Sequence, residues 1–300
     1  MSEKRFKKKE KVKKTKKPRT KKDIVYNILI CLFATTFLIS GGFLLRDMYF
    51  LPKMSDDAIT EIEQELYAEL EILQESNNDI AVDLESEEAI VETYTSSLSD
   101  AVAVLREKYP DLVGWIKIEN TDVHFPVMKS DESDPEYYLR RNYKGESITY
   151  GSIFHDGVSD VDSVNQILHG HNMRDGRMFA CLNDYYDIEF YQTAPTIEYT
   201  TYEEEAIWKI IAIFEIKVTD DDYFKYIVSD FKNDEAKQEY IDTLLELSVI
   251  DTGVDVNVDD YFLTLSTCSS DPSNYRTVVV ARKVRDGEDP SVDTSLAVYN

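Results

Sequence analysis

Cysteine is scarce in this sequence, with three residues in a chain of 300. Cys31 falls in a long apolar run, which leaves Cys181 and Cys268 for the rest of the chain. Two cysteines do not make a disulfide framework, so the sequence excludes a small domain held together by disulfides. The two could still pair with each other. An unpaired thiol on an exported protein would instead point to chemistry.

Lysine and arginine are absent between Met54 and Leu105 and are concentrated at the start of the chain. Residues 1–23 hold 13 of the 33 basic residues and 3 of the 58 acidic residues. This segment therefore carries a charge of +10, and the remainder carries −35. An acidic body repels phosphate, which speaks against nucleic acid as a partner. The alternative interpretation is that the acidic surface only keeps the protein soluble.

One long run without charge is present, IVYNILICLFATTFLISGGFLL, at residues 24–45. Its 22 residues can cross about 30 Å of hydrocarbon as a helix. The positive charge lies on its N-terminal side, which predicts a single-pass membrane protein with a cytoplasmic N-terminus and an extracellular body. No small-x-small cleavage site follows the run, so we favour an uncleaved anchor over a signal peptide. Residues 1–23 would then contact anionic lipid or act only as an orientation signal.

The next segment, residues 46–98, is predicted to be an acidic helical stalk or linker. Apolar residues recur there at helical spacing, at Ile59, Ile62, Leu66, Leu70 and Leu73. A short coiled-coil dimer is the alternative, but the stripe is brief. A further helix is expected from near Ser99 to Pro110.

The period changes after Val113, and the sequence predicts a mainly β domain over residues 99–285. Strand candidates are GWIKIENTDVHFPVM (two strands), YGSIFHD, NQILHG, TIEYTTY, AIWKIIAIFEIKV, DDYFLTLSTC and YRTVVVARKV. One helix, DEAKQEYIDTLLELSVI, interrupts them. Seven or eight short strands with few helices indicate a closed or nearly closed β-barrel. Residues 286–300 form a polar tail that we expect to be frayed.

The strand YFLTLSTC ends at Cys268, which is followed by serines. Cys268 is therefore either the last buried residue of the strand or a nucleophile at its end. A cysteine nucleophile needs a base or cation that favours the thiolate and a donor for the oxyanion. ILHGHNMRDGRMF supplies His169 and His171, which alternation places on the same face of a strand. Arg276 follows a predicted turn, and a tight hairpin there would bring its guanidinium near the thiol. A core cysteine remains the alternative, and the histidines lack the paired spacing of a metal site.

These residues resemble a known family. Leu265-Ser266-Thr267-Cys268 with Arg276 on the next strand, and Gly170-His171-Asn172-Met173 before them, look like a sortase. The opening VGWIKIENTDVHFPVM and the stretch SDESDPEYYLRRNYKGESITYGSIFHD resemble the class B branch, as does the helix before the cysteine strand. The resemblance extends from about Leu105 to Val284.

The resemblance implies a sortase-type barrel and a cysteine transpeptidase of a Gram-positive surface. Cys268 matches the nucleophile, His171 the catalytic histidine and Arg276 the catalytic arginine. Thr267 matches the threonine that shapes the substrate site, and Ser266 and Asn142 lie where class B enzymes contact substrate. One departure is His169, where the family often has tyrosine.

The same resemblance implies the reaction and its partners. The enzyme would cleave an LPxTG-like or NPxT-like sorting motif after threonine and transfer the surface protein to an amine of peptidoglycan or a lipid-linked precursor. No metal or organic cofactor is expected. The alternatives are a pilin-polymerising sortase, a thiol peptidase that releases the acyl group to water, and a surface module without enzymatic activity.

Overall fold

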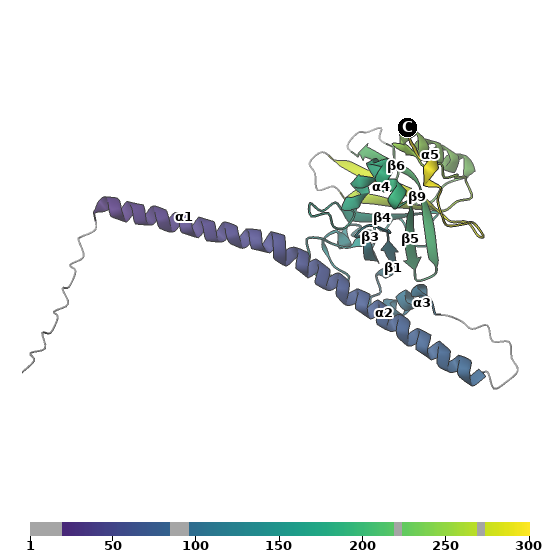
Figure 1. Cartoon of the computed structure of the whole chain (residues 1–300), viewed down its shortest axis with the longest axis horizontal. Coiled ribbons are helices and arrows are strands. Elements are labelled where there is room, and N and C mark those ends of the chain that lie inside the picture. Colours follow the sequence, from purple (N-terminus) through teal and green to yellow (C-terminus); the bar gives the residue numbers. More distant parts are fainter. Residues whose placement is uncertain (1–19, 85–95, 219–223, 269–273) are drawn as a thin grey trace, which may run out of the picture. The chain divides into compact units, whose positions relative to one another are not determined.

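The computed structural model describes residues 20–84, 96–218, 224–268 and 274–300, and the side chains of 77–84 and of Cys268 lie outside this description. The chain divides into two compact units, Met1–Phe50 and Leu51–Asn300. The helices are α1 (Lys21–Leu45), the π-helix η1 (Arg46–Phe50), α2 (Leu51–Leu84), α3 (Leu98–Lys108), α4 (Ile188–Thr193) and α5 (Asp234–Leu247), with 3-10 helices η2 (Tyr137–Arg140), η3 (Ala180–Tyr186) and η4 (Thr294–Leu296) (Figure 1). The strands are β1 (Leu112–Lys117), β2 (His124–Lys129), β3 (Ile153–His155), β4 (Asn165–His171), β5 (Thr196–Thr201), β6 (Glu205–Lys217), β7 (Ile250–Asp251), β8 (Phe262–Cys268), β9 (Tyr275–Lys283) and β10 (Val298–Tyr299).

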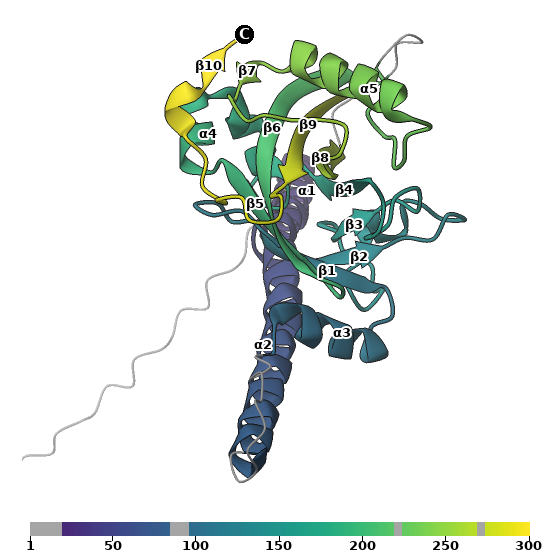
Figure 2. The ribbon, with the colours of Figure 1, turned by 90° about the vertical axis from the view of Figure 1, so that its right-hand side faces the viewer.

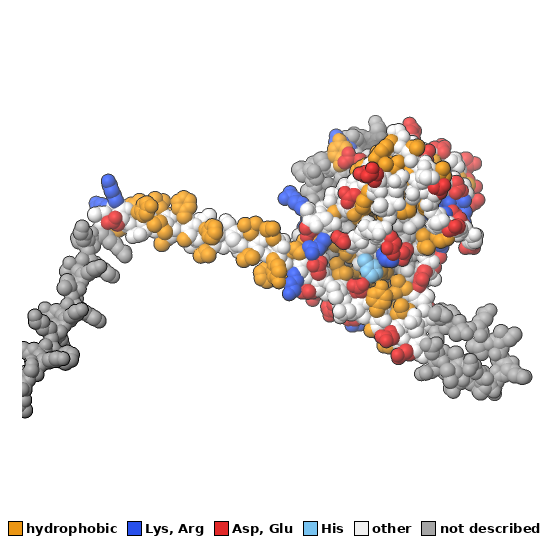
Figure 3. All heavy atoms as spheres, viewed as in Figure 1, with side chains coloured by type: hydrophobic (Ala, Val, Ile, Leu, Met, Phe, Trp, Pro, Cys, Tyr) orange, Lys and Arg blue, Asp and Glu red, His pale blue; other side chains and the backbone are white. Residues whose placement is uncertain are grey.

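The first unit contains α1, which begins at a complete capping box. The Thr20 side chain accepts from the backbone N–H of Asp23, and the Asp23 carboxylate accepts from the backbone N–H of Thr20. Large apolar side chains along α1 are exposed, and Figure 3 shows them as orange patches along the helix. Within the described residues, one helical stretch, which begins at Lys21, is long and apolar enough to cross a membrane. Its composition is therefore that of a membrane-spanning helix.

The second unit is built on a closed barrel with the strand order β1-β2-β3-β4-β8-β9-β6-β5. The predicted mainly β fold and closed barrel are confirmed. Neighbouring strands are antiparallel except for two parallel pairs, β2 with β3 and β4 with β8. The second pair positions the candidate site, because parallel strands end at the same edge of a sheet.

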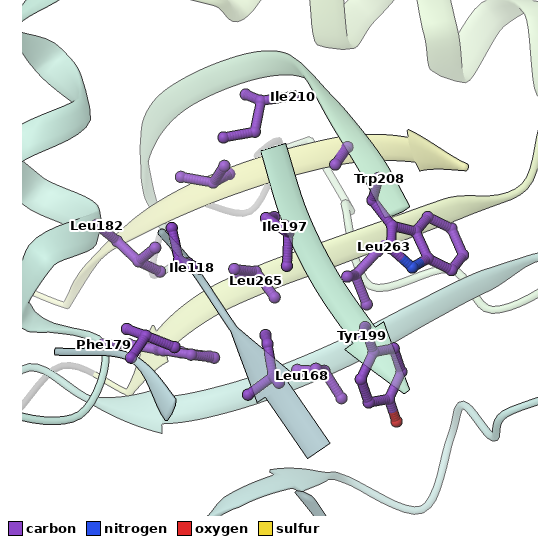
Figure 4. Close-up of a cluster of buried hydrophobic side chains, with 14 of the residues drawn as sticks. Ile118, Leu168, Phe179, Leu182, Ile197, Tyr199, Trp208, Ile210, Leu263 and Leu265 are labelled. Atoms are coloured by element: carbon purple, nitrogen blue, oxygen red, sulfur yellow. The ribbon is translucent and has the colours of Figure 1, made fainter. Parts of the chain in front are cut away.

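Alternation along the strands separates the barrel core from its outer coverings. Leu263 and Leu265 of β8 point into the core, where they meet Leu168 of β4 and Ile197 of β5 (Figure 4). Phe262 points the opposite way and packs in a second cluster with residues of α5. Figure 2 shows α5 and α3 on opposite sides of the barrel. One strand therefore stabilises two layers.

A third cluster lies where α2 and α3 cover the barrel. Ile62 and Leu66 of α2 are fully buried there, with Trp115 of β1 among their neighbours. Ion pairs surround the cluster and join α2 to the barrel unit: Glu65 with Lys108 at 2.8 Å, Glu61 with Lys144 at 2.7 Å and Asp56 with Arg177 at 2.9 Å. The apolar stripe within the predicted stalk therefore packs against its own domain.

The expectation of a frayed C-terminal tail is wrong. Glu288 accepts two hydrogen bonds of 2.7 Å from the guanidinium of Arg282, whose side chain is 1% exposed. Val298 and Tyr299 then pair with β7 as β10. The tail is ordered in part because it supplies, beside Asp255, a carboxylate for a cation buried at the barrel wall.

Candidate active site

The ends of β4 and β8 bring together the predicted catalytic histidine, His171, and the predicted nucleophile, Cys268. The parallel register pairs His171 with Cys268, Gly170 with Thr267 and His169 with Ser266. His171 and Cys268 are the last residues of their strands. The side chain of Cys268 lies outside the described part of the structure, so its position is known here by its backbone alone. That backbone is the direct neighbour of the His171 backbone.

Arg276 lies at the start of β9, next to β8. The antiparallel register of β8 and β9 pairs Ser266 with Val278. Cys268 is two residues past Ser266, and Arg276 is two residues before Val278, so Cys268 ends β8 at the edge where β9, with Arg276 near its start, begins. The side chain of Arg276 is partly exposed, and its Nη1 donates to the Tyr275 carbonyl at 3.1 Å. Three neighbouring strands thus bring His171, Cys268 and Arg276 to one edge of the barrel.

Gly170 lets β4 lie close to the barrel interior just before His171. A Cβ at this position would lie 2.5 Å from Ile153 Cδ1 and 2.7 Å from Phe179 Cδ2. The backbone N–H of Phe179 also donates to the His171 carbonyl at 2.9 Å. The motif HGHNM therefore needs glycine at position 170, because a side chain there would collide with the barrel core. The absence of a side chain lets β4, which carries His171, pack closely.

The ring of His171 is held by a backbone group. Its Nε2 lies 2.7 Å from the carbonyl oxygen of Leu139 in η2, and the residue is 8% exposed. A carbonyl can only accept, so Nε2 is the donor in this bond. The ring in its neutral form then has Nδ1 as the nitrogen that can accept a proton.

The other histidines have structural partners. His155 is fully buried between Ser159 Oγ at 2.9 Å and Tyr199 OH at 3.1 Å, and burial lowers its pKa to about 3. His124 lies 3.2 Å from Glu63 Oε1 of α2. Neither belongs to β4 or β8.

His169 differs from His171 in its surroundings, although both belong to β4. Its Nε2 lies 3.1 Å from Asp156 Oδ2. Burial alone would raise the pKa of Asp156, but the hydrogen bond and charge of His169 outweigh it and hold that pKa below its usual value. His169 is also paired with Ser266 rather than with Cys268. The geometry therefore favours His171 as the partner of Cys268.

Thr267 and Ser266, two of the predicted substrate residues, are buried. Thr267 Oγ1 accepts from the Thr277 backbone N–H at 3.1 Å, which joins β8 to β9 next to the site. Ser266 Oγ is 2.8 Å from the hydroxyl of Tyr226. Both hydroxyls therefore make hydrogen bonds within the protein, and their role toward substrate stays a prediction.

Asn142, the third predicted substrate residue, stabilises its own turn. Its Oδ1 accepts from the backbone N–H groups of Lys144 and Glu146, and its Nδ2 donates to the Glu146 carboxylate. It also lines a small cavity that α2 closes together with Phe125 and Tyr143. Its part in substrate binding stays a prediction.

Sequence reasoning missed the carbonyl of Leu139 and the carboxylate of Asp156. A backbone carbonyl leaves no trace in residue type, so no motif could have indicated the first. Asp156 directly follows His155 in YGSIFHD, and an acid beside a histidine was a usable signal for the second.

Comparisons with known proteins agree with this geometry. A family profile described as Sortase domain matches residues 116–284. Sortase B of Listeria monocytogenes is 32% identical over 212 residues, which cover 67% of this chain and 82% of that protein. The structure of a Staphylococcus aureus sortase B–substrate complex superposes with a TM-score of 0.58 at 29% identity and covers 75% of this chain and 99% of that one. A sortase B complexed with triglycine gives a TM-score of 0.57 at 29% identity, with 74% and 99% covered.

Members of this family are in general cysteine transpeptidases. With the barrel, the profile and these relatives in agreement, the chain belongs to the sortase family and, within it, to the class B sortases.

Proposed function

We propose that this chain is a membrane-anchored transpeptidase that joins surface proteins to a cell-wall amine through a thioester on Cys268. The observation that carries the proposal is the parallel register of β4 and β8, which makes His171 and Cys268 neighbours. The antiparallel register of β9 supports Arg276 as the third member. The solved relatives with a substrate and with triglycine support a peptide substrate and an amine acceptor.

The reaction has two acyl-transfer steps. The thiolate of Cys268 attacks the carbonyl carbon of the threonine in an LPxTG-like or NPxT-like motif, and the guanidinium of Arg276 stabilises the oxyanion. The C–N bond breaks, the leaving amine takes a proton from the His171 imidazolium, and a thioester remains. An incoming amine then loses its proton to neutral His171, attacks the thioester and releases the thiolate as the new amide forms.

Cys181 offers a useful contrast within the same domain. Burial raises the pKa of its thiol to about 12, so it stays protonated at neutral pH. The thiolate is the nucleophilic form of cysteine. Of the two cysteines outside the apolar run, Cys181 is therefore the poor candidate, which supports Cys268.

α1 and the charge pattern support a location at the cell membrane. The apolar helix would anchor the chain with residues 1–23 in the cytoplasm and the barrel outside, where exported substrates emerge. Peptidoglycan or its lipid-linked precursor would supply the acceptor amine on that side.

The test is product analysis with the full chain in detergent. Peptides with LPxTG-, SPxTG- and NPxTN-like motifs are incubated with and without a diaminopimelate-type amine. We expect an amide product that requires the amine, retained in Cys181→Ala and lost in Cys268→Ala. Release of the free acid alone, whether or not amine is present, would indicate a thiol peptidase, and no cleavage of any peptide would contradict an enzymatic role.

A further inference from the structure

Gly151 lies against the carbonyl that holds His171. This glycine has φ of 61°, in the left-handed region that side chains rarely adopt. A Cβ there would lie 2.2 Å from the Leu139 carbonyl oxygen and 2.8 Å from the Tyr138 carbonyl oxygen. Real Cβ atoms essentially never come this close to another heavy atom. Any side chain at 151 therefore requires the Leu139 carbonyl, or the backbone of residue 151 itself, to shift.

Hydrogen bonds tie the segment around Gly151 to η2. Ser152 donates its backbone N–H to the Tyr138 carbonyl at 3.0 Å and its hydroxyl to the Arg141 carbonyl at 2.9 Å. Ile148 donates its backbone N–H to the Arg140 carbonyl at 3.0 Å. Ile153, which follows Ser152, begins β3 and pairs with Val127 in the barrel. The position of the Leu139 carbonyl is thus fixed from the barrel wall through Ser152.

We infer that Gly151 is a positioning residue: its missing side chain lets the Leu139 carbonyl reach His171 Nε2 and so sets Nδ1 as the nitrogen that exchanges the proton. The bond of 2.7 Å between Nε2 and Leu139 O is what the glycine makes room for. An imidazole that loses this partner can turn or change tautomer, and its base nitrogen then points elsewhere. The effect on turnover rests on the proposed function, whereas the tautomer does not.

The experiment reads the ring nitrogens of His171 by ¹⁵N NMR of the full chain in detergent micelles, with the signals assigned by comparison with His171→Gln. We expect the neutral ring of the wild type to carry its proton on Nε2. Gly151→Ala should give a mixture of tautomers and lower kcat/KM of transpeptidation roughly a hundredfold, the loss typical of a misplacement of about 1 Å.

Gly287→Ala is the matched control. Gly287 also has a positive φ, of 75°, but a Cβ there meets nothing within 4 Å. It therefore carries the backbone strain of the substitution without the contact. We expect its tautomer and its kcat/KM to match the wild type.

Three results would overturn the inference. A neutral wild-type ring with its proton on Nδ1 would do so without any variant. An Nε2–H tautomer that persists unchanged in Gly151→Ala would do so whatever the activity. Equal losses of kcat/KM in Gly151→Ala and Gly287→Ala would mean that backbone strain alone is responsible.

If Gly151→Ala does not fold, Gly151→Asn takes its place, because asparagine tolerates positive φ while its Cβ keeps the same contact. A wild type with the expected tautomer but no transpeptidation would refute the proposed function. The dependence of the tautomer on Gly151 would still be tested by the variants.

Discussion

Gly170→Ala should destabilise the barrel by overpacking the inner side of β4. The new methyl would have to displace Ile153 Cδ1 and Phe179 Cδ2, which lie 2.5 and 2.7 Å from its position. Extra carbon in a packed core costs about 1–3 kcal/mol. For a unit of this size that is a fall in Tm of about 2–12 °C. Because β4 ends at His171, the formation of acyl-enzyme should slow as well.

A double-mutant cycle identifies the cause. Ile153→Val removes the Cδ1 atom that the new methyl would meet and on its own should cost about 0.5–1.5 kcal/mol. If the contact is the reason for the loss, Gly170→Ala combined with Ile153→Val should be more stable than the sum of the single changes by at least about 0.5 kcal/mol. Denaturant unfolding of the four proteins measures this coupling. Strict additivity, or a Gly170→Ala protein as stable as the wild type, would refute the packing explanation of the glycine.

Three further predictions concern the rest of the domain. Ile62→Ala should cost about 2–5 kcal/mol in denaturant unfolding because α2 is part of the core, whereas a loss below about 0.5 kcal/mol would mean a detached helix. Glu288→Gln should lower the free energy of unfolding at pH 7. The hydrogen bonds from Arg282 lower the pKa of Glu288, so the ionised carboxylate stabilises the fold above the pKa that it has in the unfolded chain. The difference in stability from the wild type should shrink as the pH falls below about 4, and a constant difference would contradict this. Cys181 should react with a thiol reagent at pH 7 far more slowly than in the urea-unfolded chain, and equal rates would contradict its burial.

The strands of the barrel could be predicted because each is short, apolar on at least one face and bounded by turn residues. YRTVVVARKV and YFLTLSTC became β9 and β8 with the hairpin register that the site needs. The helix predicted from Asp234 agrees with α5. Local patterns were sufficient here because the strand period does not depend on what covers the sheet.

The coverings could not be predicted, because they depend on contacts distant in sequence. The stripe with Ile62 and Leu66 indicated a helix, but nothing in it says whether a second copy or the same domain buries it. The tail looked polar and loose because its main partner, Arg282, lies on a strand that reads as ordinary.

The candidate site divides in the same way. His171, Cys268 and Arg276 have reactive side chains in a recognisable pattern, so the sequence could indicate them. Asn142 was predicted on the same resemblance; the structure shows its amide hydrogen-bonded within its own turn, and its role toward substrate stays a prediction. The role of Gly151 depends on the space that it leaves for a backbone oxygen, and a single sequence contains no sign of that space.

The most direct test of the central claim is to locate the acyl group on the enzyme. The full chain is mixed with a sorting-motif peptide without acceptor amine, and its intact mass and proteolytic peptides are measured. We predict a thioester on Cys268 that disappears when amine is added and does not form in Cys268→Ala. An adduct on Cys181 would contradict the claim that β8 ends in the nucleophile. So would a Cys268→Ala variant that still turns the peptide over.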